Sequence, residues 1–100
     1  MRNLLLLFPI GLLVTSCIGR PPADATGAEI YTQVCSNCHA PDLSGGIGPA
    51  LGAGSNSATQ DDAFLELTIT RGRGRMPSFQ NTLSDEQIER LIAFIRDRQR

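Results

Sequence analysis

The chain has 100 residues, with nine arginines, no lysine, ten acidic residues and a formal charge of −1 at neutral pH. This length allows one small domain and excludes a dinucleotide-binding fold, a TIM barrel or a large multidomain enzyme. The nearly balanced charge lacks the positive excess that is typical of nucleic-acid-binding domains, so we expect no nucleic acid among the partners. The chain has only one His, three Cys and two Met. Any reactive site must therefore be built from few residues or depend on a cofactor.

The first 16 residues have the pattern of an export signal. Arg2 supplies a positive charge, and an apolar run follows from Leu4 to Val14. This run is about 11 residues long, short of the roughly 20 that a membrane-spanning helix needs. It ends in VTSC at residues 14–17, which resembles the lipobox of bacterial lipoproteins. The resemblance implies cleavage before Cys17 and lipidation of that residue. An ordinary secretory signal and a retained membrane anchor are the alternatives.

Cleavage there divides the chain into a signal peptide at 1–16, a lipidated cysteine and tether at 17–25, and a domain at 26–100. Residues 18–25 contain Pro and have no periodic apolar face, which predicts a tether with a reach of at most roughly 26 Å. The mature chain has 84 residues, of which only 19 are apolar and larger than Ala or Cys. So few apolar side chains imply that something else helps to fill the core.

A short amphipathic helix is predicted to begin near Thr26. Thr26 and Glu29 have the spacing of a capping box, and apolar residues then recur at intervals of three and four. This pattern predicts a helix that ends before Pro41. Residues 41–60 contain five Gly and two Pro and predict a long irregular loop. Such a loop is unusual in a small domain unless it wraps around something.

Two more helices are predicted in the second half of the chain. Residues 61–70 begin with a helix cap but alternate like a strand; we favour a helix because the chain offers no second strand for pairing. The last helix is clearer, because Ser84 and Gln87 form another capping box. An apolar face follows at helical spacing, made of Ile88, Leu91, Ile92 and Ile95. The predicted architecture is therefore all-α, with extensive loops.

The sequence CSNCH at residues 35–39 is the attachment signature of c-type haem. Positions i and i+3 share one face of a helical turn, so the thiols of Cys35 and Cys38 can reach two vinyl groups on one haem edge. The adjacent His39 can then reach the iron. The alternatives are a CxxC redox pair, which needs a βαβ context, and a zinc site, which needs about four Cys or His ligands. The sequence offers neither a βαβ pattern nor four such ligands. In contrast, the export signal supplies the extracytoplasmic setting that haem attachment needs.

With this signature, residues 26–98 resemble the class I cytochromes c, a family of small monohaem electron carriers. Three other segments carry the resemblance: GPAL at 48–51, GRGRMPSF at 72–79, and the closing segment from Leu83 to Ile95. The resemblance implies a small all-α cytochrome c fold, with about three to four helices and long loops wrapped around one covalently bound haem c.

The resemblance also implies that the first and last helices cross. In this chain the crossing would pair Gly27 and Tyr31 with Leu91 and Phe94. A glycine at such a crossing allows two backbones to approach closely.

Two residues are candidate axial ligands of the iron. In the mature chain His39 is the only imidazole and Met76 the only thioether, so ligation by two His is excluded. Met76 could instead fill a gap in the core, but its place beside Pro77 in a Gly-rich loop favours ligation. The resemblance implies that the carbonyl of Pro49 accepts a hydrogen bond from the other ring nitrogen of His39, which would orient the ring.

Arginines cluster in two places. Arg71, Arg73 and Arg75 could bind haem propionates or form a positive rim that steers an acidic partner, and a solvated loop is an equal alternative. At the C-terminus, solubility is the favoured explanation for Arg96, Arg98 and Arg100, which surround Asp97.

We predict an electron-transfer protein rather than an enzyme, with no catalytic residues. One haem c on Cys35 and Cys38 would cycle between Fe(II) and Fe(III), with His39 and Met76 as metal ligands. The resemblance implies a monomer that exchanges electrons with an oxidase, a bc-type complex, a reaction centre or a dehydrogenase. Lipid on Cys17 would hold it to a bacterial membrane, on the periplasmic side or the outer face of the cell membrane. The alternatives are a haem-based gas sensor with a labile Met76 and a cytochrome subunit of a larger dehydrogenase.

Overall fold

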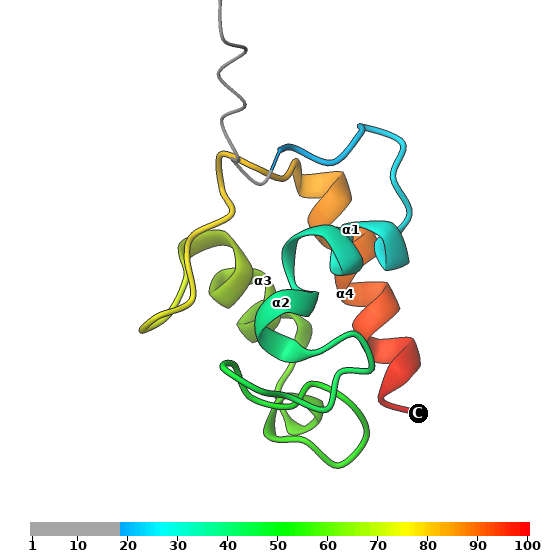
Figure 1. The fold of residues 1–100 in the computed structure, drawn as a ribbon, viewed down its shortest axis with the longest axis vertical. Helices are drawn as coiled ribbons and strands as arrows, with labels where there is room; N and C mark the ends of the chain where they lie inside the picture. Colours follow the sequence, from blue (N-terminus) through cyan, green and yellow to red (C-terminus); the bar gives the residue numbers. More distant parts are fainter. Residues whose placement is uncertain (1–18) are drawn as a thin grey trace, which may run out of the picture.

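The structure, a computed structural model, describes residues 19–100, and the predicted signal peptide and Cys17 lie outside these residues. The described chain is helical and contains no strand beyond one isolated bridge, which confirms the all-α class (Figure 1). None of the described helices is both long and apolar enough to cross a membrane. The elements in chain order are α1 (Gly27–Val34), α2 (Ser36–His39), the 3₁₀ helix η1 (Asn56–Thr59), α3 (Asp62–Arg71) and α4 (Asp85–Arg98).

The predicted helix starts are confirmed. The hydroxyl of Thr26 accepts from the Glu29 N–H at 3.1 Å, and the Glu29 carboxylate accepts from the Thr26 N–H at 3.2 Å. Ser84 and Gln87 make the same reciprocal pair at the start of α4. Residues 62–71 are helical, as favoured, with the Asp61 carboxylate accepting from the N–H of Phe64 at 2.8 Å. These caps satisfy donors that a helix leaves free in its first turn.

The first predicted helix is divided into two. α1 ends at Val34, and Cys35 follows as its C-cap, with φ −115° and ψ −34°. The Cys35 carbonyl then accepts from the N–H groups of both Cys38 and His39, at 3.2 and 3.0 Å, and thereby starts the single turn of α2. The haem-attachment sequence therefore has a turn of its own, separate from the helix that packs in the core.

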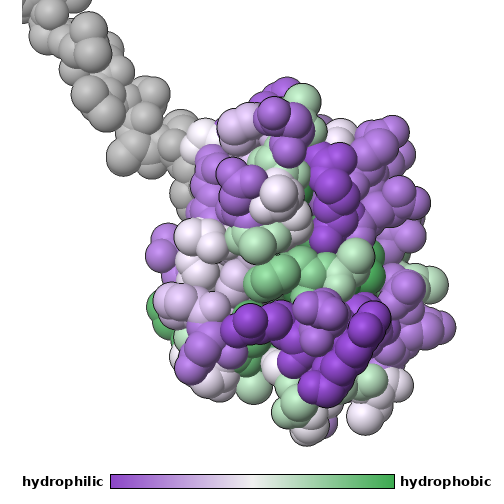
Figure 2. All heavy atoms as spheres, turned by 90° about the vertical axis from the view of Figure 1, so that its right-hand side faces the viewer, coloured by the Kyte–Doolittle hydropathy of each residue, from purple (hydrophilic) through white to green (hydrophobic). Residues whose placement is uncertain are grey.

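α1 crosses α4 at Gly27. A Cβ on Gly27 would lie 2.2 Å from the backbone oxygen of Arg90 and 2.8 Å from Cβ of Phe94. One turn later the rings of Tyr31 and Phe94 pack with centroids 5.4 Å apart. The predicted approach of these two helices is thus observed. Figure 2 shows the side of the molecule where they lie, with an apolar band crossing a mostly hydrophilic face.

Side chains at the end of α4 form hydrogen bonds to the long loop over residues 41–60. The Arg96 guanidinium pairs with Asp62 at 2.8 Å and also donates to the carbonyls of Ser57 and Gln60. The side-chain amide of Gln99 donates to the carbonyl of Leu51 at 2.9 Å. Solubility therefore does not explain Arg96, whose contacts join the C-terminal helix to residues 51–62. Arg98 and Arg100 are exposed, as expected.

Residues 19–25, here called the N-terminal strap, lie against the domain instead of extending from it (Figure 1). Side chains of Gln33, Gln87 and Arg90 donate to carbonyls along the strap. Ala25 is buried as part of the core. The expectation that residues 18–25 form a tether and that the folded part begins near Thr26 is therefore wrong from Gly19 onward, because the strap's carbonyls accept hydrogen bonds from α1 and α4.

We predict that Gly27→Ala lowers the free energy of unfolding by about 1–3 kcal/mol, since the added methyl group meets a backbone oxygen that cannot move aside. Chemical denaturation of the haem-loaded protein measures this. The matched control is Gly19→Ala, where nothing lies within 4 Å of the new Cβ. Equal stability of the two variants would contradict the close crossing.

Candidate functional site

The two cysteines of the attachment sequence differ in exposure. Cys35 is buried and Cys38 is exposed, and no disulfide joins them. Burial, with a smaller contribution from Cys38, raises the pKa of the Cys35 thiol to about 12. A CxxC redox pair needs the opposite, a thiol whose pKa is lowered. Within residues 19–100 no three His, Cys, Asp or Glu side chains gather in a way that could hold a metal ion, so the zinc alternative finds no support in this part of the chain.

His39 is oriented by a backbone carbonyl. The residue is 7% exposed, and its Nδ1 lies 2.7 Å from the oxygen of Pro49. A carbonyl can only accept, so the proton of the neutral ring belongs on Nδ1 and the lone pair on Nε2. The contact implied by the resemblance is thus present, and it leaves one nitrogen ready to bind a metal.

The loop after α2 wraps around the His39 ring. Its backbone returns to the attachment turn twice, with the N–H of Gly45 donating to the His39 carbonyl at 2.9 Å and that of Gly48 to the Cys38 carbonyl at 2.8 Å. A Cβ on Gly48 would lie 2.8 Å from Cε1 of His39. The absence of a side chain at residue 48 is therefore what allows the loop to lie against the ring.

Tyr31 supports the same turn from the core side. It is 1% exposed, and its hydroxyl donates to the carbonyl of Ala40 at 2.6 Å. Ala40 ends α2 with φ +70°, which is unfavourable for a residue with a Cβ. The resemblance predicts Tyr31 only at the helix crossing, and its hydrogen bond to Ala40 was not expected. The sequence did hold a signal for this role: the only Tyr of the chain lies on the apolar face of the first helix, one turn before Cys35. A buried hydroxyl there needs a hydrogen-bond partner near the attachment turn.

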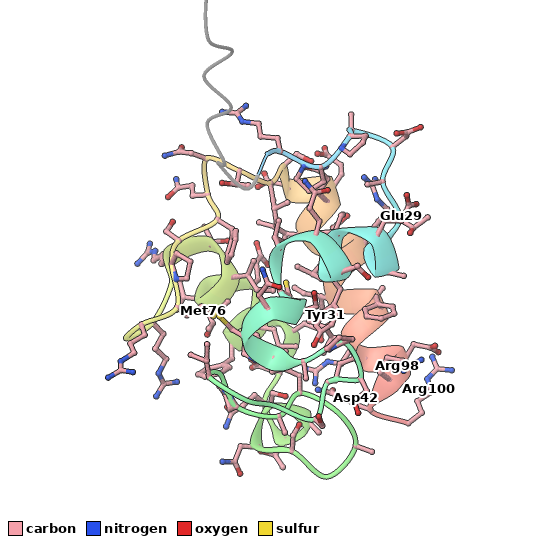
Figure 3. All side chains as sticks on the ribbon, viewed as in Figure 1. Glu29, Tyr31, Asp42, Met76, Arg98 and Arg100 are labelled. Atoms are coloured by element: carbon pink, nitrogen blue, oxygen red, sulfur yellow. The ribbon has the colours of Figure 1, made fainter. Side chains whose placement is uncertain are left out.

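Met76 lies in a tight backbone loop that follows α3 (Figure 3). Arg73 and Met76 exchange two backbone hydrogen bonds, at 3.1 and 2.9 Å. Gly72 adopts φ +76°, and a Cβ there would lie 2.5 Å from the Met76 carbonyl. The side chain of Met76 is partly buried against the core. The backbone that carries the Met76 thioether is therefore held in place by these two hydrogen bonds and by its close approach to Gly72.

The arginines before Met76 face solvent. Arg71, Arg73 and Arg75 are exposed, and none of them forms an ion pair within residues 19–100. The guanidinium of Arg73 lies 5.4 Å from the ring centroid of Phe64, a cation–π distance. This geometry suits both a positive rim and a solvated loop.

The residues present fit a covalently bound haem. One turn offers two thiols followed by an imidazole whose Nε2 is free, and a loop offers a thioether. Apolar side chains near these groups are incompletely covered: Ile47 is 80% exposed, and Leu51, Phe64 and Met76 are only partly buried. An apolar macrocycle is the kind of group that such side chains can cover.

A helical domain with this donor set defines a c-type cytochrome. The family model described as "Cytochrome C oxidase, cbb3-type, subunit III" matches residues 22–95, and the chain belongs to this family of cytochromes c. It carries haem c bound covalently through Cys35 and Cys38, and it acts in electron transfer.

Relatives cover most of the chain. It is 36% identical to cytochrome c55X of Stutzerimonas stutzeri, over 93% of this chain and 77% of the relative. It is 31% identical to the cytochrome c subunit of 4-cresol dehydrogenase [hydroxylating] from Pseudomonas putida, over 81% and 67%. The solved structure of the c-type cytochrome NirC matches with a TM-score of 0.63 at 27% identity, over 71% of this chain and 85% of that one.

We predict that Gly48→Ala displaces the His39 ring, because its new Cβ would overlap the imidazole. The expected results are an altered haem absorption spectrum and a stability loss of about 1–3 kcal/mol. Gly46→Ala is the matched control, since its Cβ would make an ordinary 3.5 Å contact with the Cys38 oxygen. A wild-type spectrum for Gly48→Ala would show that the loop does not fix the ring.

We predict that Tyr31→Phe costs about 1 kcal/mol of stability, because the Ala40 carbonyl retains only the Leu43 N–H at 3.1 Å. Burial raises the pKa of Tyr31 to about 12 from 10.0. The folded state therefore holds this proton more tightly than the unfolded state, so the stabilisation is complete below pH 10 and is lost as the pH rises through 12. Denaturation of both proteins from pH 9 to 12 should show the difference shrinking. A constant difference would contradict this role.

Proposed function

We propose that the protein is a membrane-tethered monohaem electron carrier, a monomer in which His39 and Met76 are the axial ligands of the haem iron. The observation that carries this proposal is the 2.7 Å contact between Nδ1 of His39 and the Pro49 carbonyl. This contact supports the proposal because it puts the proton of a neutral ring on Nδ1, which leaves Nε2 as the nitrogen that would bind the iron, and it orients the ring.

The bound haem supplies an iron that changes between Fe(II) and Fe(III). His39 donates through Nε2, and Met76 supplies a soft thioether that favours the reduced state. With His39 and Met76 as its ligands, the haem would offer no open site for a substrate, which agrees with a carrier rather than an enzyme. Weak, short-lived encounters need only a small interface. Arg71, Arg73 and Arg75 are exposed and form no ion pair with any residue from 19 to 100, so they could steer an acidic partner.

The partners are redox proteins of the kinds named above. The relative named as the cytochrome c subunit of a 4-cresol dehydrogenase favours one alternative, in which this chain is the cytochrome subunit of a larger dehydrogenase. Co-purification with a catalytic chain after detergent extraction would support that role. A gas sensor is the other alternative, and it differs in the strength of the bond between Met76 and iron.

The proposed location is extracytoplasmic, on the periplasmic side or the outer face of a bacterial membrane. Its support is the export signal at residues 1–16 and the lipobox-like sequence that ends at Cys17. Two or more acyl chains suffice for stable attachment to a membrane.

We predict that Met76→Ala keeps the haem attached but opens one axial position. The ferrous variant should bind carbon monoxide rapidly, and its reduction potential should fall by roughly 0.1 V or more. Absorption spectra with and without carbon monoxide, and a redox titration, measure this. Leu67→Ala, at a half-exposed position of α3, is the control. Rapid binding of carbon monoxide to the wild type would instead favour the gas sensor, and an unchanged Met76→Ala spectrum would refute the ligand assignment.

We predict that Cys17→Ala releases the haem-loaded protein from the membrane fraction. Fractionation of cells that express either form measures the effect, and mass spectrometry of the wild-type N-terminus identifies the lipid. A Cys17→Ala protein that stays with the membranes would point to an uncleaved anchor or a tightly bound partner.

A further inference from the structure

The N-terminal strap is built into the fold through a buried amide. The side chain of Gln87 is 5% exposed. Its Nε2 donates to the carbonyls of Pro21 and Pro22 at 3.3 and 3.0 Å, while its Oε1 accepts from the N–H of Ser84 at 2.9 Å. If the strap left, this buried Nε2 would lose both of its partners. Intramolecular hydrogen bonds give a modest net stabilisation over bonds to water, so these contacts favour the docked position of the strap.

Two more side chains hold the strap along its length. Arg90 donates to the carbonyls of Ala23 and Ala25 at 2.7 and 3.0 Å. At the other end, Nε2 of Gln33 donates to the carbonyl of Gly19 at 2.7 Å. The strap is therefore bound from its first described residue up to the start of α1.

Docking shortens the link to the proposed lipid. Only Ile18 lies between Cys17 and Gly19, so the Cα atoms of these two residues can be at most about 7 Å apart. A link of this length leaves the domain little freedom to turn on the membrane. The surface around Gly19 and Arg20 must then lie close to the headgroups.

This surface has a suitable chemistry for headgroups. The strap borders a shallow hollow whose charged lining residue is Arg20, and the other polar lining residues are the amides and hydroxyls of Gln80, Asn81, Thr82, Ser84 and Gln87. Arg20 can pair with a lipid phosphate, and the exposed amides of Gln80 and Asn81 and the Ser84 hydroxyl can donate to ester and phosphate oxygens. Asp85 and Glu86 follow at the start of α4 and are exposed. They oppose attraction to an anionic surface, which leaves the anchor to supply the binding.

We infer that the strap end of the molecule, made of Arg20 and residues 80–84, is a membrane-facing surface whose occupant is phospholipid headgroups. The inference rests on the proposed lipidation of Cys17. The opposite end, with the loop over residues 41–60 and the labelled Arg98 and Arg100, then points away from the bilayer (Figures 1 and 3). The strap sets this orientation, which a free tether would not.

The test compares two exposed asparagines at opposite ends, Asn81 beside the strap and Asn56 in the long loop. Each is changed to Cys in the full-length, haem-loaded lipoprotein, where Cys17 carries lipid and Cys35 and Cys38 hold haem, and the new thiol receives a nitroxide. The reduced protein is bound to phosphatidylcholine vesicles that contain a lipid with a gadolinium-chelate headgroup. Relaxation enhancement should be severalfold greater at residue 81 than at residue 56.

Two variants separate orientation from attachment. A flexible Gly-Ser insert of about six residues after Ile18 lengthens the link without touching the strap. The double change Gln33→Ala and Arg90→Ala removes three of the strap's hydrogen bonds. Both variants should stay on the vesicles, while the ratio of the relaxation enhancement at residue 81 to that at residue 56 falls towards one. Equal relaxation at the two positions of the lipidated wild type would overturn this inference and leave the carrier function intact.

A second measurement tests the strap without membranes. Heteronuclear ¹⁵N–¹H NOE values of Arg20, Ala23 and Asp24 in the haem-loaded protein should match those of α4 and should fall in the double variant. Low values in the wild type would overturn the inference whatever the state of Cys17. Absence of lipid on Cys17 would instead overturn the proposed anchor, and the membrane-facing surface with it. If the nitroxide at residue 81 is shielded from solvent when no vesicles are present, a protein occupies this face of the molecule. That result would also overturn the inference.

Discussion

The hydrogen bond from Nδ1 of His39 to the Pro49 carbonyl is the constraint on which the site depends. It requires the loop after α2 to turn back on the ring, and that return requires a residue without a side chain at Gly48. The same loop bonds to the carbonyls of Cys38 and His39. A long irregular segment, which would be a liability in a small domain, thereby becomes a rigid holder for one imidazole.

α4 supports this arrangement from both of its ends. Near its start, Gln87 and Arg90 bind the N-terminal strap, and at its end Arg96 and Gln99 bind the loop over residues 51–60. Between these ends it packs on α1, whose Tyr31 reaches the carbonyl that follows His39. A domain with few large apolar residues thus relies on side-chain hydrogen bonds to irregular backbone, in addition to its apolar core.

The parts of this structure that follow local rules could be predicted from the sequence. The capping boxes at Thr26 and Ser84 involve residues three positions apart, and the helix over 62–71 followed from the lack of any strand to pair with. The order of CxxCH, Gly-Pro and Met-Pro segments indicated the family. The role of Arg96 and the docking of residues 19–25 could not be predicted, because their partners are backbone carbonyls far along the chain, which carry no sequence signal. Tyr31 had a signal in its position one turn before Cys35, but nothing in the sequence marked the Ala40 carbonyl as its acceptor.

The burial of Cys35 has a consequence for the order of assembly. In the folded domain this thiol is shielded, and burial raises its pKa to about 12, so it is a poor nucleophile there. A chain that emerges with its N-terminus first exposes residues 35–39 before residues 85–98, which complete the fold, have appeared. Both thiols are therefore open in the emerging chain, and Cys35 is shielded once the domain has folded, so we expect the thioethers to form before folding is complete.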